Sequence, residues 1–108
     1  MPPGREDVAR GFYGALLGLP EIPKPADLAA RGGVWFESGT VKVHLGVDPG
    51  FRPAKKAHPG LLVDDLRDLV EVLRRAGHEV QDGEPLDGYA HCYVDDPFGN
   101  RLELMERA

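Results

Sequence analysis

Two kinds of hydrophobic spacing alternate along this chain of 108 residues, and each predicts a different element. Apolar residues spaced three and four positions apart indicate amphipathic helices over residues 7–17 and 66–76. In the second of these, Leu66, Leu69 and Leu73 share one side. We expect Asp64 or Asp65 to cap this helix at its start and Gly77 to end it.

Alternation of apolar and polar residues predicts strands elsewhere, because side chains on a strand point to opposite faces in turn. Fourteen glycines and ten prolines separate these segments, which is typical of short strands joined by turns. The second half of the chain is predicted to contain a strand, a helix and three further strands, and the first half a helix and three strands. The two halves therefore look like one unit used twice, with the opening strand of the first copy absent. The predicted strands are residues 21–23, 33–37, 41–47, 57–63, 78–80, 89–94 and 101–106, with a helical turn at 26–30.

The segment from residue 33 to residue 47 predicts a hairpin with a two-residue loop at Ser38 and Gly39, since glycine supplies the positive φ. With Glu37 opposite Thr40, Trp35 would face Lys42. One face of this hairpin would carry the valines and pack. The other face, which suits a cavity, would carry Trp35, Lys42 and His44.

A turn followed by a strand is predicted from Asp95 to Glu106. Pro97 presets φ at an early turn position, and Gly99 and Asn100 accept left-handed conformations. In the strand that follows, Leu102 and Leu104 would pack. Pairing the apolar faces of strands 89–94 and 101–106 sets Val94 opposite Leu102, Cys92 opposite Leu104 and Tyr93 opposite Glu103, and it leaves Tyr89, His91, Tyr93, Arg101 and Glu103 on the non-packing face.

Composition narrows the function classes. A net charge of −5 without a basic stripe argues against nucleic acid and anionic membranes as partners. No apolar run approaches the roughly 20 residues of a membrane span, and the single Cys92 permits no internal disulfide. We therefore expect one soluble, cytoplasmic domain in which Cys92 is a small buried apolar group.

The chain resembles the glyoxalase, bleomycin-resistance and extradiol-dioxygenase superfamily, also called vicinal oxygen chelate proteins. The resemblance covers nearly the whole chain, and its most specific part runs from Asp96 to Leu104. It implies an α+β fold of paired βαβββ modules, whose curved mixed sheets enclose a pocket, with the first strand of module one missing. Module one would span residues 1–47, the linker 48–57 and module two 58–108. The residues that carry the resemblance are 9–13 and 17–19, Val43-His44-Leu45, His58 with Leu62-Val63-Asp64, and 96–104.

The same resemblance implies a metal site. Metal-using members of the superfamily take one ligand from the first and fourth strand of each module, and His44, His58 and Glu103 match three of these four positions. Two imidazoles and a carboxylate suit Fe, Mn, Ni or Zn as a divalent ion. The fourth position would precede Met1, so either the natural chain starts upstream, which we favour, or three ligands suffice.

The leading hypothesis is a small metal-dependent enzyme whose metal chelates two neighbouring oxygens of a small oxygenated organic substrate. Tyr93 and His91 would be its acid and base, although both residues equally suit mere ligand binding, and the pocket would bind substrate through Trp35, Lys42, Tyr89 and Arg101. The alternative is a metal-free, drug-sequestering protein of the bleomycin-resistance kind that stacks a planar ligand on its aromatic residues. A third possibility is an inert relic of either. We expect a homodimer, because a module short of one strand leaves a sheet edge for a partner chain to cover.

Overall fold

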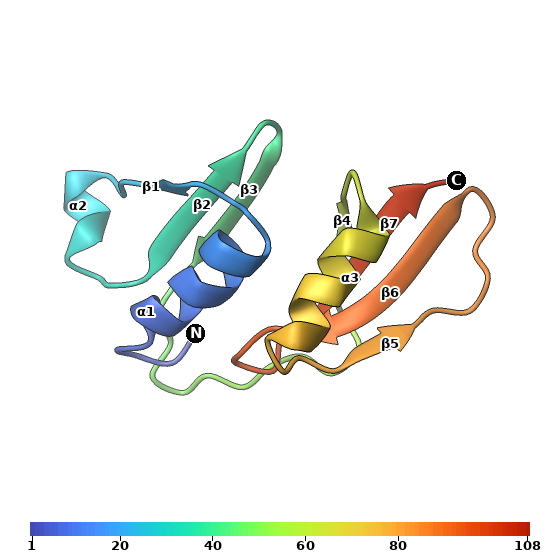
Figure 1. Cartoon of the computed structure of the whole chain (residues 1–108). Helices are drawn as coiled ribbons and strands as arrows, with labels where there is room; N and C mark the ends of the chain where they lie inside the picture. Colours follow the sequence, from blue (N-terminus) through green and yellow to red (C-terminus); the bar gives the residue numbers. More distant parts are fainter. The chain divides into compact units, whose positions relative to one another are not determined.

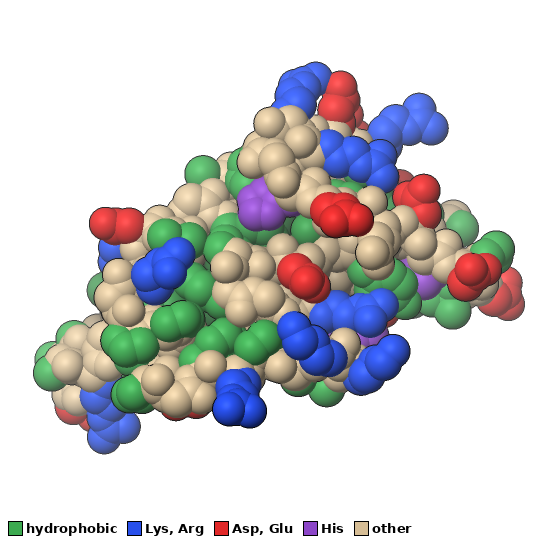
Figure 2. All heavy atoms as spheres, turned by 90° about the horizontal axis from the view of Figure 1, so that it is seen from below, with side chains coloured by type: hydrophobic (Ala, Val, Ile, Leu, Met, Phe, Trp, Pro, Cys, Tyr) green, Lys and Arg blue, Asp and Glu red, His purple; other side chains and the backbone are tan.

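The computed structural model describes all 108 residues and divides them into two compact units, Met1–Arg52 and Pro53–Ala108. Each unit combines one open, curved sheet with a helix against it, so the chain is an α+β protein as predicted (Figure 1). None of its helices is long and apolar enough to cross a membrane. The face drawn in Figure 2 carries acidic, basic and hydrophobic side chains.

The first unit begins with α1 (Glu6–Ala9), which continues directly into the π-helix η1 (Arg10–Leu16). The periodicity predicts a helix here but not its widening. The Leu17 N–H donates to the Phe12 carbonyl five residues back, at 3.0 Å, which is the π-helical spacing. Phe12 and Tyr13 are both buried, and the Tyr13 ring lies 5.8 Å from the ring of Phe36, so η1 packs on the sheet through aromatic side chains.

This sheet has the order β1-β2-β3, with β1 at Glu21–Ile22, β2 at Val34–Ser38 and β3 at Val41–Leu45, all antiparallel. A short helix α2 (Ala26–Ala29) precedes β2. The predicted hairpin register is wrong by two residues, because Ser38 pairs with Val41 and the loop is Gly39-Thr40. Trp35 therefore lies opposite His44 rather than Lys42. A slip of two leaves every side chain on its predicted face, since the faces alternate with period two.

Met1 lies beside the end of β3. Its ammonium group donates to the Gly46 carbonyl at 2.7 Å, and its own carbonyl accepts from the Asp48 N–H at 2.9 Å. The rest of the outer edge of β3 has no strand partner within this sheet.

The second unit has the order β4-β7-β6-β5, with β4 parallel to β7 and the other pairs antiparallel. Helix α3 (Leu66–Arg75) lies across one face of this mixed sheet (Figure 1). The strands are β4 (Gly60–Leu62), β5 (Val80–Asp82), β6 (Tyr89–Asp95) and β7 (Arg101–Arg107).

Two predicted strand starts are corrected in this unit. β4 begins at Gly60, which places Pro59 just before the strand, where its missing N–H costs no ladder bond. β5 begins at Val80, because the end of α3 uses the preceding residues: Gly77 adopts φ 92° and the His78 N–H donates to the Leu73 carbonyl at 3.0 Å.

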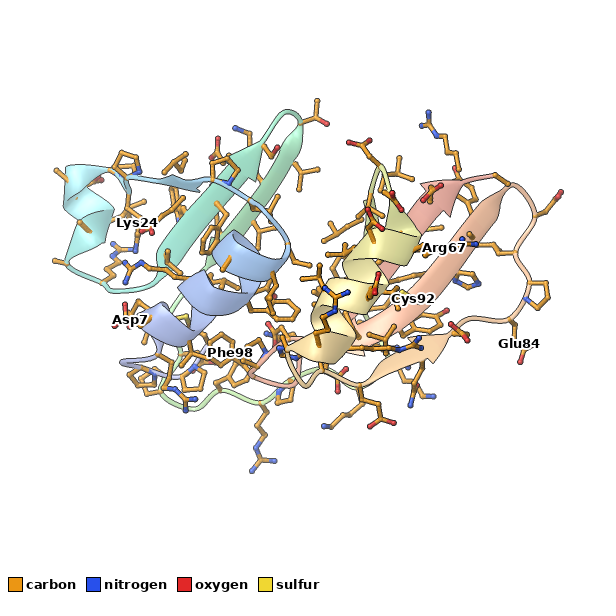
Figure 3. All side chains as sticks on the ribbon, viewed as in Figure 1. Asp7, Lys24, Arg67, Glu84, Cys92 and Phe98 are labelled. Atoms are coloured by element: carbon orange, nitrogen blue, oxygen red, sulfur yellow. The ribbon has the colours of Figure 1, made fainter.

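The predicted pairing of β6 with β7 is confirmed, with Val94 opposite Leu102, Cys92 opposite Leu104 and Tyr93 opposite Glu103. The face toward α3 is buried, and Cys92 lies there between β6 and the helix (Figure 3). Burial raises the pKa of the Cys92 thiol, which fits a small apolar group as predicted. The opposite face of the sheet is free to carry polar chemistry.

Candidate functional site

The centre of the candidate site is the Glu103 carboxylate, which β7 presents on the sheet face opposite α3. Its Oε1 lies 2.9 Å from Nε2 of His58, and its Oε2 lies 2.8 Å from Nδ1 of His91. The Glu103 side chain is only 13% exposed. Each oxygen of one nearly enclosed carboxylate is thus held by a different imidazole.

Backbone carbonyls hold the outer nitrogens of both rings. Nδ1 of His58 donates to the Lys56 carbonyl at 2.8 Å. Nε2 of His91 donates to the carbonyl of Glu84, a residue on the loop after β5 (Figure 3). Anchoring of this kind is typical of metal-binding histidines, whose second N–H is held by a carbonyl or carboxylate.

Tyr93 lies opposite Glu103 on β6 and meets both imidazoles edge-on, with ring centroids 5.5 Å from His58 and 5.6 Å from His91. The Arg101 guanidinium lies over the face of the Tyr93 ring, 4.3 Å from its centroid. Stacking fixes the plane of the guanidinium and leaves its N–H edges available to a bound anion or carbonyl. Arg101 and Tyr93 also line an open hollow of about 390 Å³ in this unit.

The turn before β7 sets where Arg101 and Glu103 lie. Asp96 is buried, and its Oδ1 accepts from the N–H groups of Phe98 and Asn100, each at 2.9 Å, while Oδ2 accepts from the Asn100 side chain at 2.8 Å. Of the two residues expected to accept a left-handed conformation, only Gly99 adopts a positive φ, of 88°. Asn100 closes the turn with its side chain instead.

The first unit carries a separate cluster around the predicted ligand His44. Its ring stacks on Trp35 with centroids 3.7 Å apart and planes 1° from parallel, and its Nε2 lies 2.9 Å from Oε2 of Glu37. Nζ of Lys42 lies 3.0 Å from the other Glu37 oxygen. Hydrogen bonds from His44 and Lys42 hold the pKa of Glu37 below its usual range. His44, Trp35 and Lys42 therefore share one face, as predicted, around a carboxylate that the sequence argument passed over.

The electrostatics of the second unit follow from these contacts. Partial burial pushes the pKa of Glu103 upward, but hydrogen bonds from His58 and His91 outweigh it and hold that pKa below its usual range. The carbonyl of Glu84 raises the pKa of His91 against the effect of burial, and Glu103 adds to the rise. The carboxylate is stabilised as an anion, and His91 is stabilised as a cation.

Counting hydrogens shows what this group of side chains requires. All four ring nitrogens of His58 and His91 face oxygens that accept, so four hydrogens are needed, whereas two neutral imidazoles supply two. A second proton on His91 supplies the hydrogen that this ring lacks, and either a proton or a metal cation must then lie between Nε2 of His58 and Oε1 of Glu103. The donor set thus fits a divalent metal held by His58 and Glu103. No group of three or more His, Cys, Asp or Glu side chains in the structure is arranged to hold a metal ion.

Other predicted residues lie near these clusters or stay apart from them. Tyr89 begins β6 and lies opposite Arg107 of β7, at the other end of this strand pair from Arg101. Sequence reasoning missed Gly83 and Glu84, which hold His91 through packing and a backbone carbonyl. Their only sequence signal is a turn-rich segment, because a carbonyl contact leaves no trace in residue type.

A βαβββ unit, preceded by a second unit of similar order and carrying its polar site on the open face of the sheet, defines the glyoxalase class of fold. The glyoxalase-like domain family matches residues 5–105, and the chain belongs to that family. The resemblance stated from the sequence is thereby confirmed. A search of curated proteins finds no match to this sequence.

Solved structures agree. A protein from Bacillus anthracis described as a glyoxalase family protein is 44% identical, with a TM-score of 0.94 over 100% of this chain and 88% of that one. An antibiotic-binding protein, TnmS3 from Streptomyces sp. CB03234, is 18% identical, with a TM-score of 0.73 over 100% and 91% of the two chains. Lactoylglutathione lyase from Agrobacterium tumefaciens is 21% identical, with a TM-score of 0.69 over 94% and 84%. The last two share the fold alone.

Proposed function

We propose that this protein is a small metal-dependent enzyme of the glyoxalase type, acting on a small oxygenated organic molecule. The observation that carries the proposal is the pairing of Glu103 with His58 at 2.9 Å, in which a ring nitrogen and a carboxylate oxygen, both common metal ligands, face each other and share a proton or a metal cation. His58 and Glu103 would hold the metal, and the resemblance adds His44 as a further ligand. A bound Fe, Mn, Ni or Zn ion would supply Lewis-acid polarisation of two neighbouring substrate oxygens.

His44 must change partner under this proposal. Its Nε2 is hydrogen-bonded to Glu37, so it would exchange that carboxylate for the metal. Lys42 contacts the other oxygen of Glu37 and is positioned to keep that side chain in place once His44 leaves it. The stacked Trp35 ring would orient the imidazole and offer an apolar surface to the substrate.

Arg101 is the residue best placed to orient a substrate in the second unit. It is half-buried, is stacked on Tyr93 and lines the hollow beside that ring. We assign Arg101 to substrate binding. We assign proton transfer to Tyr93, whose ring contacts both imidazoles of the Glu103 site.

Titration with Co²⁺, followed by its visible absorption, tests the proposal. The wild-type protein should bind about one equivalent, and His58→Ala should abolish binding because Glu103 then loses its partner donor. Glu103→Gln should weaken binding strongly, since a neutral amide is a poor metal ligand. His78→Gln is the matched control, because this histidine lies at the end of α3 and is outside the proposed ligand set, and it should bind as the wild type does. Equal Co²⁺ binding by wild type and His58→Ala would refute the proposed ligands.

One observation favours a second candidate function, a metal-free small-molecule-binding protein. Without any metal, the His44 imidazole is already engaged on its edge by Glu37 and on its face by Trp35. A planar ligand that took the place of His44 would stack on the same Trp35 surface. Trp35 is the single tryptophan, so its fluorescence reports on this surface alone. Under this candidate, bleomycin or another planar aromatic compound should quench that fluorescence at micromolar concentration in the absence of metal.

We further propose a cytoplasmic homodimer. The buried thiol of the single Cys92 and the absence of any disulfide fit a reducing compartment. The outer edge of β3 lacks a strand partner within its sheet, and unpaired edges of this kind favour covering by a second chain.

A further inference from the structure

The His91 ring is more enclosed than the His58 ring and is held at both nitrogens. Its side chain is 8% exposed, and both ring nitrogens are engaged, Nδ1 by Glu103 and Nε2 by the Glu84 carbonyl. A general acid or base needs one nitrogen free to reach the substrate. His91 offers none, so the predicted proton-transfer role does not match its contacts.

Gly83 is shaped around this ring. A Cβ built on Gly83 would lie 2.4 Å from Cε1 of His91 and 2.5 Å from Nε2, far inside van der Waals contact. The φ of Gly83 lies outside the left-handed region, so the backbone itself would accept other residues. The Gly83 N–H also donates to the His91 carbonyl at 3.2 Å. The imidazole, and not the turn, therefore requires glycine at this position.

We propose that His91 is a positioning residue for Glu103. Seated on Gly83 and tied to the Glu84 carbonyl, His91 fixes Oε2 of Glu103 and thereby turns Oε1 toward His58 and the proposed metal. A glutamate side chain has three rotatable bonds, so holding one oxygen removes most of the freedom of the other. This inference rests on the proposed metal site and adds to it the group that orients its carboxylate ligand.

Two substitutions separate the two bonds of His91. The amide nitrogen of asparagine overlaps Nδ1 of histidine, so His91→Asn keeps a donor for Glu103. The amide nitrogen of glutamine overlaps Nε2, so His91→Gln keeps the hydrogen bond to the Glu84 carbonyl and loses the hydrogen bond to Glu103. Because outer-shell partners of metal ligands typically contribute 10- to 100-fold in affinity, His91→Gln should weaken Co²⁺ binding about 10- to 100-fold. His91→Asn should stay within about threefold of wild type.

Gly83→Ala tests the same claim without touching a polar group. The added methyl group displaces the His91 ring and should weaken Co²⁺ binding about tenfold. The control is Gly46→Ala, where the new Cβ meets nothing within 4 Å and φ is ordinary, and it should bind as wild type does. The thermal unfolding midpoint of every variant is measured as well, to establish that each is folded at the titration temperature.

Three results would overturn the positioning role. Wild-type affinity in His91→Gln would show that the contact does not matter. An equal loss of Co²⁺ affinity in His91→Gln and His91→Asn would show that the imidazole ring matters only through its packing. Complete loss of the Co²⁺ site in all His91 variants would make His91 a ligand.

Failure of the proposed function is recognised separately. If wild type binds no Co²⁺, the metal proposal fails, and crystal structures of the metal-free proteins decide the inference. Glu103 should then occupy one rotamer in wild type and His91→Asn, and several in His91→Gln. A single Glu103 rotamer in His91→Gln would refute the role of His91 as its positioning residue.

Discussion

At the scale of single residues, alternation along β7 correctly places Glu103 opposite Tyr93 and away from the packed face. The sequence does not reveal what surrounds it, because Lys56 and Glu84 act through backbone carbonyls and Gly83 acts by lacking a side chain. The face of the sheet that a side chain takes follows from the two-residue period of a strand. Contacts between residues distant in the chain depend on the tertiary fold.

Asp96 is a second residue whose role the turn motif leaves open. It is buried with a full set of hydrogen bonds inside the turn that starts β7. Asp96→Ala should lower the free energy of unfolding by about 2–3 kcal/mol, because buried N–H groups lose their acceptor. Urea unfolding measures this. Asp95→Ala, at the exposed neighbouring position, should change stability by less than about 0.5 kcal/mol, and an equal effect of both would contradict the account of the turn.

At the scale of elements, periodicity predicts both long helices and every strand to within a few residues, but it misses the widening of η1. The hairpin register is wrong because Ser38-Gly39 and Gly39-Thr40 are both acceptable two-residue loops. Only the packing partners of β2 distinguish them.

Glu6 ties α1 to the start of β2. Its Oε2 accepts from the Gly33 N–H at 2.9 Å, which holds the pKa of Glu6 below its usual range. A depressed carboxyl pKa contributes stability above the unfolded value of 4.5, and this contribution is lost as the pH falls through the lower folded value. Glu6→Gln should therefore cost about 0.5–1 kcal/mol at pH 7 and progressively less below pH 4.5.

The measurement is denaturant unfolding of wild type and Glu6→Gln at several pH values. Asp7→Asn is the control, since the Asp7 side chain is 97% exposed and its pairing with Arg10 is a surface ion pair worth little. A Glu6→Gln cost that does not change with pH would show that charge plays no part in this contact.

Two carboxylates stabilise the start of α3. Asp65 accepts from the Asp68 N–H at 3.2 Å, and Oε1 of Glu106 accepts from the Leu66 N–H at 2.6 Å. Asp65→Ala and Glu106→Ala should each cost about 1 kcal/mol in thermal unfolding. Asp64→Ala, which removes a carboxylate that makes no hydrogen bond to the helix, should cost almost nothing. A larger loss from Asp64→Ala than from Asp65→Ala would reassign the cap.

At the scale of the whole molecule, the order of elements and the segment from Asp96 to Leu104 suffice to predict the family, because both are local in sequence. The proposed metal ligands are less accessible to sequence reasoning. They are His44, His58 and Glu103, and strand alternation says only which face of a strand each side chain takes.

The open edge of β3 predicts a homodimer in solution. Multi-angle light scattering at 10–100 µM, run with and without Zn²⁺, measures the mass directly. We expect about twice the 11.8 kDa of one chain. A mass of one chain throughout this range would contradict the dimer.

The central claim is that His58 and Glu103 hold a metal ion, and metal content tests it most directly. The measurement is elemental mass spectrometry of wild type and His58→Ala, each purified without chelator or affinity tag. We predict about one equivalent of a transition metal in wild type and almost none in His58→Ala. A wild-type protein free of metal, even after soaking with Fe²⁺, Mn²⁺, Ni²⁺ and Zn²⁺, would contradict the claim and favour the metal-free binding protein.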